Sequence, residues 1–153
     1  MKLYLMQHGE ALREEEHPER PLTERGKEDV ERVAAFLARA GIRVDQIRHS
    51  GKLRAAETAN IVARQLRIPE VVAAVSGINP NDDVQPVAEE LQRETQAIML
   101  VGHLPFLSRL ASYLLAGEPG KALVQFQMGG VVCLAQQEGQ WGFAWMVVPE
   151  LLR

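Results

Sequence analysis

Short apolar runs alternate with longer amphipathic stretches along most of the chain. Leu3–Met6 and Ala97–Val101 are compact apolar runs, too short for helices and typical of strands buried on both faces. Weaker runs at Val44–Arg48 and Val71–Val75 predict two further strands. Strands that alternate with helices in this way predict an α/β fold, a three-layer sandwich with a mainly parallel central sheet and helices on both faces.

The amphipathic stretches have start and stop signals that place four helices. Each stretch has apolar residues at helical spacing, and each is bounded by a capping residue, a glycine or a proline. The predicted helices run from Thr23 to Gly41, from Leu53 to just before Pro69, from Val84 to Leu91, and from Pro105 to Gly117.

The last part of the chain, residues 123–148, has a different pattern. Strand-like runs lie around Gly129-Gly130 and Glu138-Gly139, which predicts antiparallel strands joined by tight turns. With 153 residues and no internal repeat, the chain is expected to fold as a single domain over residues 1–153.

Composition narrows the possible functions. The net charge is −3, so there is no general basic field to attract nucleic acid or an anionic membrane. No apolar run is long enough for a signal peptide or a membrane span. The single cysteine, Cys133, lies in an apolar run and has no partner for an internal disulfide. We therefore expect a cytoplasmic protein with no nucleic-acid or membrane partner.

Three polar clusters fall where a predicted strand passes into the following helix. They are residues 7–10, 49–54 and 102–105. Because the carboxyl ends of parallel strands share one edge of a sheet, and ligands bind there, we expect His8, Arg54 and His103 to lie on one rim.

Each of these residues also has an ordinary structural interpretation. A lone histidine at a strand end is often only hydrogen-bonded, an arginine at a helix start is often only solvated, and a glycine can simply permit a turn. The coincidence of all three clusters on one edge favours a functional interpretation. Imidazole is a competent nucleophile near neutral pH, and the planar arginine fork matches phosphate oxygens, so these parts suit phosphoryl transfer.

These residues also resemble the motifs of a known family. Residues 5–11 resemble the Arg-His-Gly signature of the histidine phosphatase superfamily, which includes the phosphoglycerate mutases. Residues 20–26, 49–59 and 102–105 are similar to the short SixA-type branch of phosphohistidine phosphatases. The motifs occur in order from Lys2 to about Leu114, so the resemblance covers most of the chain and implies a phosphoglycerate mutase-like fold.

The resemblance implies a two-step hydrolysis through a phosphohistidine intermediate on His8, with no metal and no cofactor. Arg54 would hold the phosphoryl oxygens, and His103 would donate a hydrogen bond as charge develops. The further residues expected to border the phosphate are Gln7, Gly9, Arg20, Ser50, Lys52 and Gly102.

The residue before the nucleophile departs from the family pattern, because Gln7 stands where an arginine is usual. A hydrogen bond to a charged group contributes about 1.5–3 kcal/mol, against roughly 0.5–1.5 kcal/mol for a neutral one. The difference corresponds to about one or two orders of magnitude in rate unless another group compensates. Lys52 could supply the missing charge, or it could be an ordinary exposed lysine.

The leaving group bears on the substrate. Larger members of the superfamily carry a carboxylic acid on an inserted helical segment, for which this chain is too short. Its loop candidates Glu10, Asp82 and Asp83 have positions typical of helix caps and surface residues. A missing acid is least harmful when the leaving group is imidazole, which favours phosphohistidine on a protein partner.

Three other functions stay open at this point. The chain could hydrolyse small phosphoesters, or it could be a degenerate member that binds phosphorylated ligands without turnover because of Gln7. A metal-dependent hydrolase is the most distant alternative, since the histidines lack the paired spacing of metal ligands.

Overall fold

One mixed sheet runs through the protein. The computed structural model describes residues 1–153. Its strands are β1 (Lys2–Gln7), β2 (Gln46–His49), β3 (Val72–Ala74), β4 (Ile98–Gly102), β5 (Val131–Gln137) and β6 (Gln140–Val147). The order across the six-stranded sheet is β3-β2-β4-β1-β5-β6. The first four strands in this order pair in parallel, and β5 and β6 add antiparallel pairs at one side.

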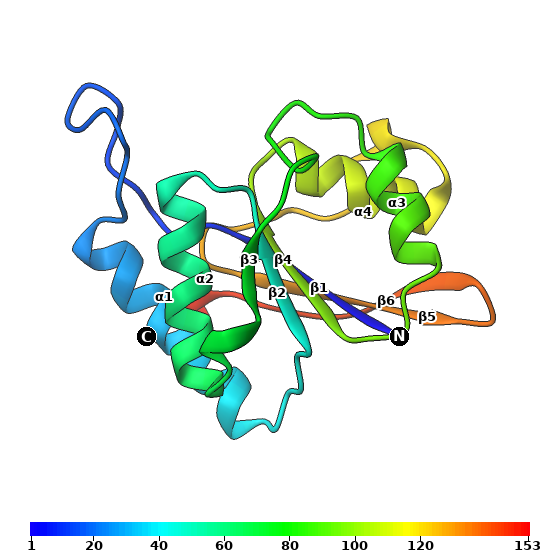
Figure 1. The fold of residues 1–153 in the computed structure, drawn as a ribbon, viewed down its shortest axis with the longest axis horizontal. Coiled ribbons are helices and arrows are strands. Elements are labelled where there is room, and N and C mark those ends of the chain that lie inside the picture. Colours follow the sequence, from blue (N-terminus) through cyan, green and yellow to red (C-terminus); the bar gives the residue numbers. More distant parts are fainter.

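Two pairs of helices cover the two faces of the sheet. They are α1 (Glu24–Arg39), α2 (Leu53–Leu66), α3 (Gln85–Gln92) and α4 (Phe106–Ala116). α1 and α2 lie on one face and α3 and α4 on the other (Figure 1), which confirms the predicted three-layer arrangement. No helix combines the length and apolarity that crossing a membrane requires.

The central strands contribute side chains to both apolar layers. On β1, Tyr4 and Met6 pack with α1 and α2, whereas Leu3 and Leu5 pack with α3 and α4. This alternation follows from the two-residue period of a strand. All four side chains are almost fully buried, so the continuous apolar run at the start of the chain is a strand covered on both faces, as the pattern predicts.

The capping signals place the helices well. Thr23 is the N-cap of α1, where its hydroxyl oxygen accepts a hydrogen bond from the Gly26 backbone N–H at 2.9 Å. α2 begins at Leu53, as predicted. Gly117 adopts a left-handed conformation with φ of 77° and ends α4, which matches its predicted role.

The second strand lies later than the hydropathy pattern predicts. β2 begins at Gln46. The preceding residue, Asp45, instead accepts the Ala97 backbone N–H with its carboxylate at 2.8 Å, just before the start of β4. The parallel register then pairs His49 with Val101, so His49 ends the strand instead of starting the following loop. Register with a distant strand is invisible to a local pattern of hydrophobicity.

Only one of the two expected tight turns joins strands. Glu138-Gly139 connects β5 to β6, as predicted. The other glycine pair follows an irregular segment instead of a strand. The Gly129 backbone N–H donates to the carbonyl oxygens of Gln7 at 3.0 Å and His8 at 3.2 Å, so this turn packs against the end of β1.

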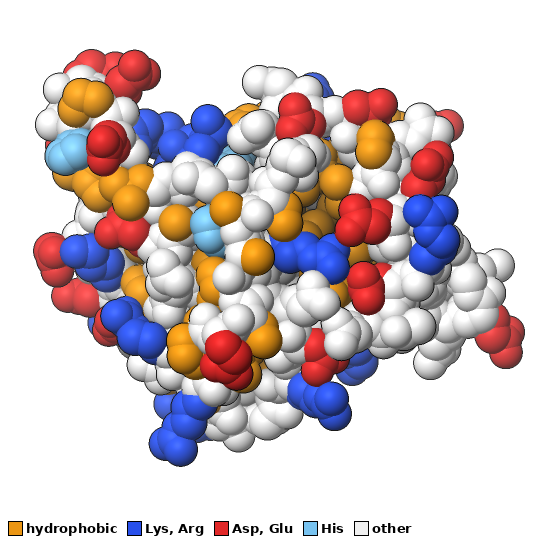
Figure 2. All heavy atoms as spheres, in the orientation of Figure 1, with side chains coloured by type: hydrophobic (Ala, Val, Ile, Leu, Met, Phe, Trp, Pro, Cys, Tyr) orange, Lys and Arg blue, Asp and Glu red, His pale blue; other side chains and the backbone are white.

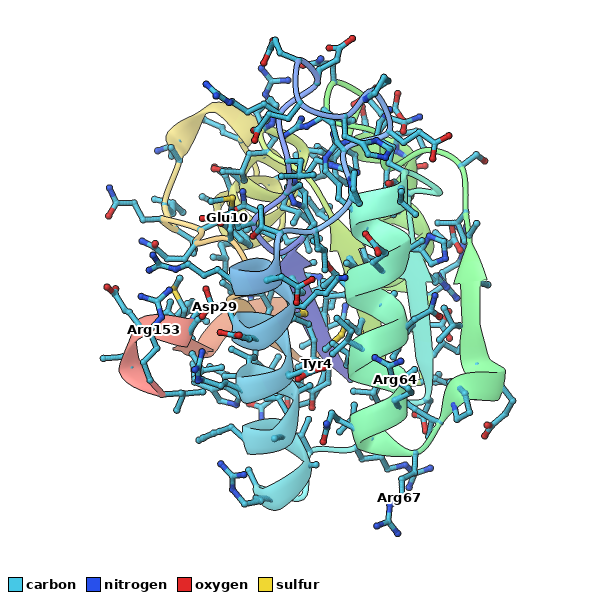
Figure 3. The ribbon with its side chains drawn as sticks, turned by 90° about the vertical axis from the view of Figure 1, so that its left-hand side faces the viewer. Tyr4, Glu10, Asp29, Arg64, Arg67 and Arg153 are labelled. Atoms are coloured by element: carbon cyan, nitrogen blue, oxygen red, sulfur yellow. The ribbon has the colours of Figure 1, made fainter.

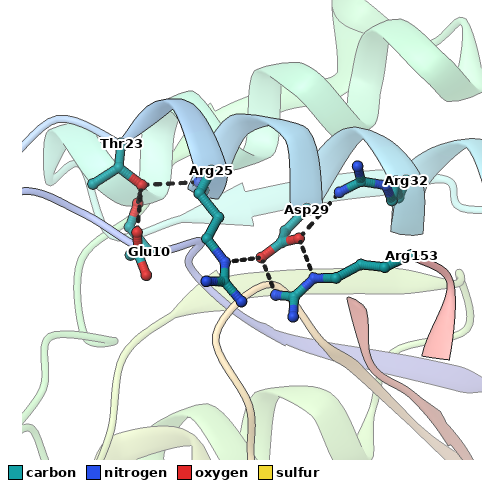
Figure 4. A network of polar contacts seen from close by, with 7 residues as sticks. Glu10, Thr23, Arg25, Asp29, Arg32 and Arg153 are labelled. Carbon is teal, nitrogen blue, oxygen red and sulfur yellow. Dashed lines mark hydrogen bonds and ion pairs between the residues drawn. The ribbon is translucent and has the colours of Figure 1, made fainter. Parts of the chain in front are cut away.

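A charge network attaches the segment after β6 to α1. Asp29 on α1 is 6% exposed, and Arg153 donates to its two carboxylate oxygens at 3.2 and 2.9 Å. Arg32 donates at 3.3 Å and Arg25 lies at 4.0 Å (Figure 4). Figure 3 shows that Asp29, Arg153 and Glu10 lie on the same side of the molecule.

Candidate active site

The carboxyl ends of β1, β2 and β4 bring the predicted site residues to one edge of the sheet. Gln7 at the end of β1 is in register with Gly102 at the end of β4, and His49 at the end of β2 pairs with Val101. Each strand is followed directly by a polar residue of the site, namely His8, His103 and Ser50. The parallel topology thus assembles pieces that are far apart in sequence.

His8 is held rigidly at the end of β1. Its backbone N–H donates to the Gly102 carbonyl at 3.0 Å, and its own carbonyl accepts from Gly129. The residue is 8% exposed, and its Nδ1 lies 2.7 Å from the Gly9 carbonyl oxygen. A carbonyl can only accept, so the neutral ring carries its proton on Nδ1 and leaves a lone pair on Nε2.

His103 lies beside the first imidazole. The two ring centroids are 5.2 Å apart, and His103 is 2% exposed. Its Nε2 is 2.6 Å from the Ser50 hydroxyl oxygen, and the same oxygen accepts a hydrogen bond from the Lys52 backbone N–H at 3.3 Å. The Nδ1 atom of His103 is buried and has no hydrogen-bond partner.

Three cationic side chains have charges that reach one or both imidazoles, namely Arg54, Arg20 and Lys52. Arg54, in the first turn of α2, is half-buried, and its Nε has no hydrogen-bond partner. Arg20 comes from the loop before α1, where its Nε donates to the Leu12 carbonyl at 3.0 Å. In Figure 2, Lys and Arg side chains gather beside the base of the projecting loop that precedes α1, while the loop tip is acidic.

Burial, with the positive charges of the site, keeps both histidines neutral. Burial, reinforced by the charges of Arg54 and Arg20, lowers the pKa of His8 to about 4. Burial, with the charges of His8, Arg54, Lys52 and Arg20, lowers the pKa of His103 to about 3. Burial and the nearby Arg20 also lower the pKa of the Arg54 guanidinium. All these neighbouring charges are positive, so an anion placed among them would be stabilised.

The glycines near the nucleophile serve packing and positioning. A Cβ on Gly9 would lie 2.8 Å from the Val30 side chain, because this residue is wedged against α1. The Gly9 N–H already donates to the Thr58 hydroxyl at 3.1 Å, so it is occupied in this structure. Gly102 contributes its carbonyl to His8.

Gln7 sits at the edge of the same cluster. Its side chain is partly buried, and its Oε1 atom is buried without a hydrogen-bond partner. Arg54 Nε and His103 Nδ1 are the other two buried side-chain atoms that lack a partner. Unpaired buried polar atoms are rare in folded proteins, and here all three belong to predicted site residues.

Two residues of α2 contribute to the site although sequence reasoning did not single them out. Thr58 is fully buried, and its hydroxyl accepts a hydrogen bond from the Gly9 backbone N–H. The Glu57 carboxylate accepts the Leu22 N–H at 2.8 Å and so ties the Arg20 loop to α2. The only sequence signal was their place inside the 49–59 motif.

The loop carboxylates are engaged elsewhere. Asp83 accepts the Gln85 backbone N–H at the start of α3, and Asp82 accepts the Asn79 N–H. Glu10 accepts the Thr23 hydroxyl at 2.8 Å. These cap and turn contacts agree with the predicted structural roles of the three acids. No group of three or more His, Cys, Asp or Glu side chains forms a set that could hold a metal ion.

Comparisons with known proteins identify relatives of this chain in sequence and in fold. Residues 3–74 match the family model of the histidine phosphatase superfamily (branch 1). The chain is 26% identical over 154 residues to the phosphohistidine phosphatase SixA of Escherichia coli (strain K12), which covers 97% of this chain and 94% of that protein. It is 30% identical over 141 residues to an uncharacterized protein of Picosynechococcus sp. (strain ATCC 27264 / PCC 7002 / PR-6), covering 88% and 84%. A solved structure of the protein histidine phosphatase SixA complexed with tungstate superposes with a TM-score of 0.88 at 25% identity, over 100% of both chains.

Proposed function

Since this chain belongs to the histidine phosphatase superfamily, in its SixA-type branch, we propose that it removes the phosphoryl group from phosphohistidine on a protein partner, as one domain over residues 1–153. His8 is the nucleophile. Arg54 and Arg20 bind the phosphoryl oxygens, and His103 donates a hydrogen bond to them as negative charge develops. The observation that carries this proposal is the free Nε2 lone pair of His8 inside a cluster of positive charges.

The first step transfers the phosphoryl group to the enzyme. The Nε2 lone pair of His8 attacks phosphorus, a P–N bond forms on His8, and the P–N bond of the substrate breaks. The new phosphohistidine ring bears positive charge, which the Nδ1–H shares with the Gly9 carbonyl 2.7 Å away. In the second step water attacks phosphorus, inorganic phosphate leaves, and His8 returns to its neutral form.

The cationic side chains around His8 support both steps by binding the phosphoryl group. Arg54 has an Nε with no partner in the structure, so a phosphoryl oxygen can take that position without displacing an existing hydrogen bond. Burial is the main cause of the low pKa of His8, and the charges of Arg54 and Arg20 lower this pKa further, so the nucleophile is unprotonated at neutral pH. The two arginines that would bind the phosphoryl group therefore also help, in addition to burial, to keep the nucleophile neutral.

The absence of an acidic group acting on the imidazoles favours phosphohistidine as the substrate. The charges that perturb His8 and His103 are all cationic, and Glu10, Asp82 and Asp83 are occupied as caps or in turns. A phosphohistidine protonated on its second ring nitrogen leaves as neutral imidazole and needs no proton from the enzyme. An alkoxide leaving group would need one.

Gln7 supports a second candidate, a member that binds phosphorylated ligands without turnover. Its neutral amide stands where the family usually has an arginine, and its Oε1 is left without a partner. Such a protein would bind inorganic phosphate but would form no phosphoenzyme.

Phosphoenzyme trapping separates these functions. The wild-type protein is mixed with a peptide carrying ³²P-labelled phosphohistidine and quenched in alkali, in which phosphohistidine survives. We expect label on His8 in the wild type, including in the presence of EDTA, and none in His8→Asn, because asparagine can keep a donor for the Gly9 carbonyl but has no Nε2. Label on a serine, or on no residue while phosphate binds, would refute the proposal.

A matched control is available at the end of β2, two strands away from β1 in the sheet. His49 is as buried as His8, and its Nδ1 accepts the Gly51 backbone N–H at 3.1 Å. His49→Asn keeps an acceptor at that place and should retain the label. Comparing rates on the phosphohistidine peptide with rates on a panel of sugar phosphates tests the small-phosphoester alternative.

A further inference from the structure

Thr58 connects the loop that carries the proposed nucleophile to the helix that carries Arg54. Its side chain is fully buried on α2, four residues after Arg54. The hydroxyl oxygen lies 2.7 Å from the Arg54 carbonyl and 3.1 Å from the Gly9 nitrogen. One side chain therefore contacts the backbone of both the nucleophile loop and the phosphate-binding arginine.

The directions of these two hydrogen bonds are determined by chemistry. The Arg54 carbonyl can only accept, so the single hydroxyl proton of Thr58 points to it. A lone pair on the same oxygen is then available for the Gly9 N–H, which can only donate. A hydroxyl satisfies both contacts, whereas an apolar side chain of the same shape satisfies neither.

Gly9 passes this constraint on to the imidazole ring. Its N–H is held by Thr58, and its carbonyl accepts the hydrogen bond from His8 Nδ1. On the opposite side, the Gly9 Cα is in tight contact with α1, where a Cβ would lie 2.8 Å from Val30 Cγ2 and 3.0 Å from the Gly26 carbonyl oxygen. Sterics from α1 and a hydrogen bond from α2 thus locate the carbonyl that selects the tautomer of His8.

We infer that Thr58 is a positioning residue for the phosphoryl-transfer reaction: through Gly9 it keeps the proton of His8 on Nδ1 and aims Nε2 at the phosphoryl group held by Arg54. This inference rests on the proposed function for its kinetic consequence. Its structural consequence, the tautomer of His8, can be measured without any substrate.

Thr58→Val and Thr58→Ser test the inference. Valine keeps the shape but removes both hydrogen bonds, and serine keeps the hydroxyl. We expect Thr58→Val to lower the rate of phosphoenzyme formation about 10- to 100-fold, which corresponds to the loss of one or two hydrogen bonds. Binding of inorganic phosphate should change only about threefold or less, since Arg54 and Arg20 remain. Thr58→Ser should restore most of the rate.

Ser112 provides a matched control. It is fully buried on α4, and its hydroxyl also joins a donor to an acceptor, the Lys121 N–H and the Glu118 carbonyl. Ser112→Ala should lose thermal stability comparably but leave phosphoenzyme formation unchanged. An equal rate loss in Ser112→Ala would mean that any buried hydroxyl has the same effect, and would overturn the inference.

The ¹⁵N chemical shifts of the His8 ring give a readout that mere destabilisation does not move. In the wild type at pH 7 we expect a protonated Nδ1 and an unprotonated Nε2, and in Thr58→Val a mixture of both tautomers. Unchanged shifts in a folded Thr58→Val would overturn the inference. If the wild type forms no phosphoenzyme but the tautomer depends on Thr58, the proposed function fails while the positioning role stands.

Discussion

The imidazole rings of His8 and His103 lie with their centroids 5.2 Å apart and their planes inclined at 52°. A proton on either ring would place a positive charge against the other ring and against Arg54. Burial is the largest cause of the low pKa of each histidine; the charge of Arg54 lowers both pKa values further, and a charge on His8 lowers that of His103.

The pH dependence of the reaction follows from this pair. The nucleophile must be unprotonated, and burial lowers the pKa of His8 from 6.5 to about 4. Activity is therefore present above this pKa and lost as the pH falls through it, so kcat/KM should stay nearly constant from about pH 7 to about pH 5. NMR titration of the ring protons measures the same pKa directly. A His8 pKa near 6.5 would contradict the burial seen here.

Gln7→Arg tests the charge that the family pattern leads us to expect. A guanidinium beside Arg54 and His8 should raise the affinity for inorganic phosphate by about tenfold, because a charged hydrogen bond replaces a neutral one. Isothermal titration with phosphate measures this change. An unchanged affinity would show that the side chain at position 7 does not reach the bound anion.

Whether Lys52 supplies the charge that Gln7 lacks can be tested by substituting it in the wild type and in Gln7→Arg. Its ammonium group contributes to the lowered pKa of His103, so it lies within electrostatic reach of the site. If Lys52 compensates for Gln7, Lys52→Ala should reduce phosphate affinity more in the wild type than in Gln7→Arg. Equal losses in the two backgrounds would identify Lys52 as an ordinary surface lysine.

Glu57 is expected to act on binding through the loop that carries Arg20. Its carboxylate accepts the Leu22 N–H at 2.8 Å. Glu57→Ala removes this anchor and should raise KM by roughly three- to tenfold, the equivalent of one hydrogen bond. Glu57→Gln keeps an oxygen acceptor and serves as the control. A fall in kcat with unchanged KM would place the effect outside the Arg20 loop.

Substitution of Asp29 should lower the stability of the fold without changing the rate of phosphoryl transfer. It is a buried carboxylate with arginines on three sides, but those arginines are 38–61% exposed, which weakens each ion pair. Asp29→Asn should lower the free energy of unfolding by about 1–2 kcal/mol, measured by urea denaturation. The rate of phosphoenzyme formation should not change, and a large loss of that rate would show coupling from α1 to Gly9.

The alternation of buried strands with capped helices was predictable from the sequence because its causes are local. Thr23 caps α1, and Gly117 ends α4, through contacts with residues a few positions away. The shift of β2 and the role of Gly129 were not predictable, because they depend on pairing with Ala97 and with the end of β1, which are distant in sequence.

For the site, the order of motifs along the chain was enough to place His8, Arg54 and His103 at one edge of a parallel sheet, since the topology of such a sheet leaves little choice. It could not reveal which nitrogen of His8 is free, that the Gly9 N–H is already occupied, or that Thr58 joins the two halves of the site. Those properties depend on distances of about 3 Å between residues from different elements, and such distances exist only after the layers have packed.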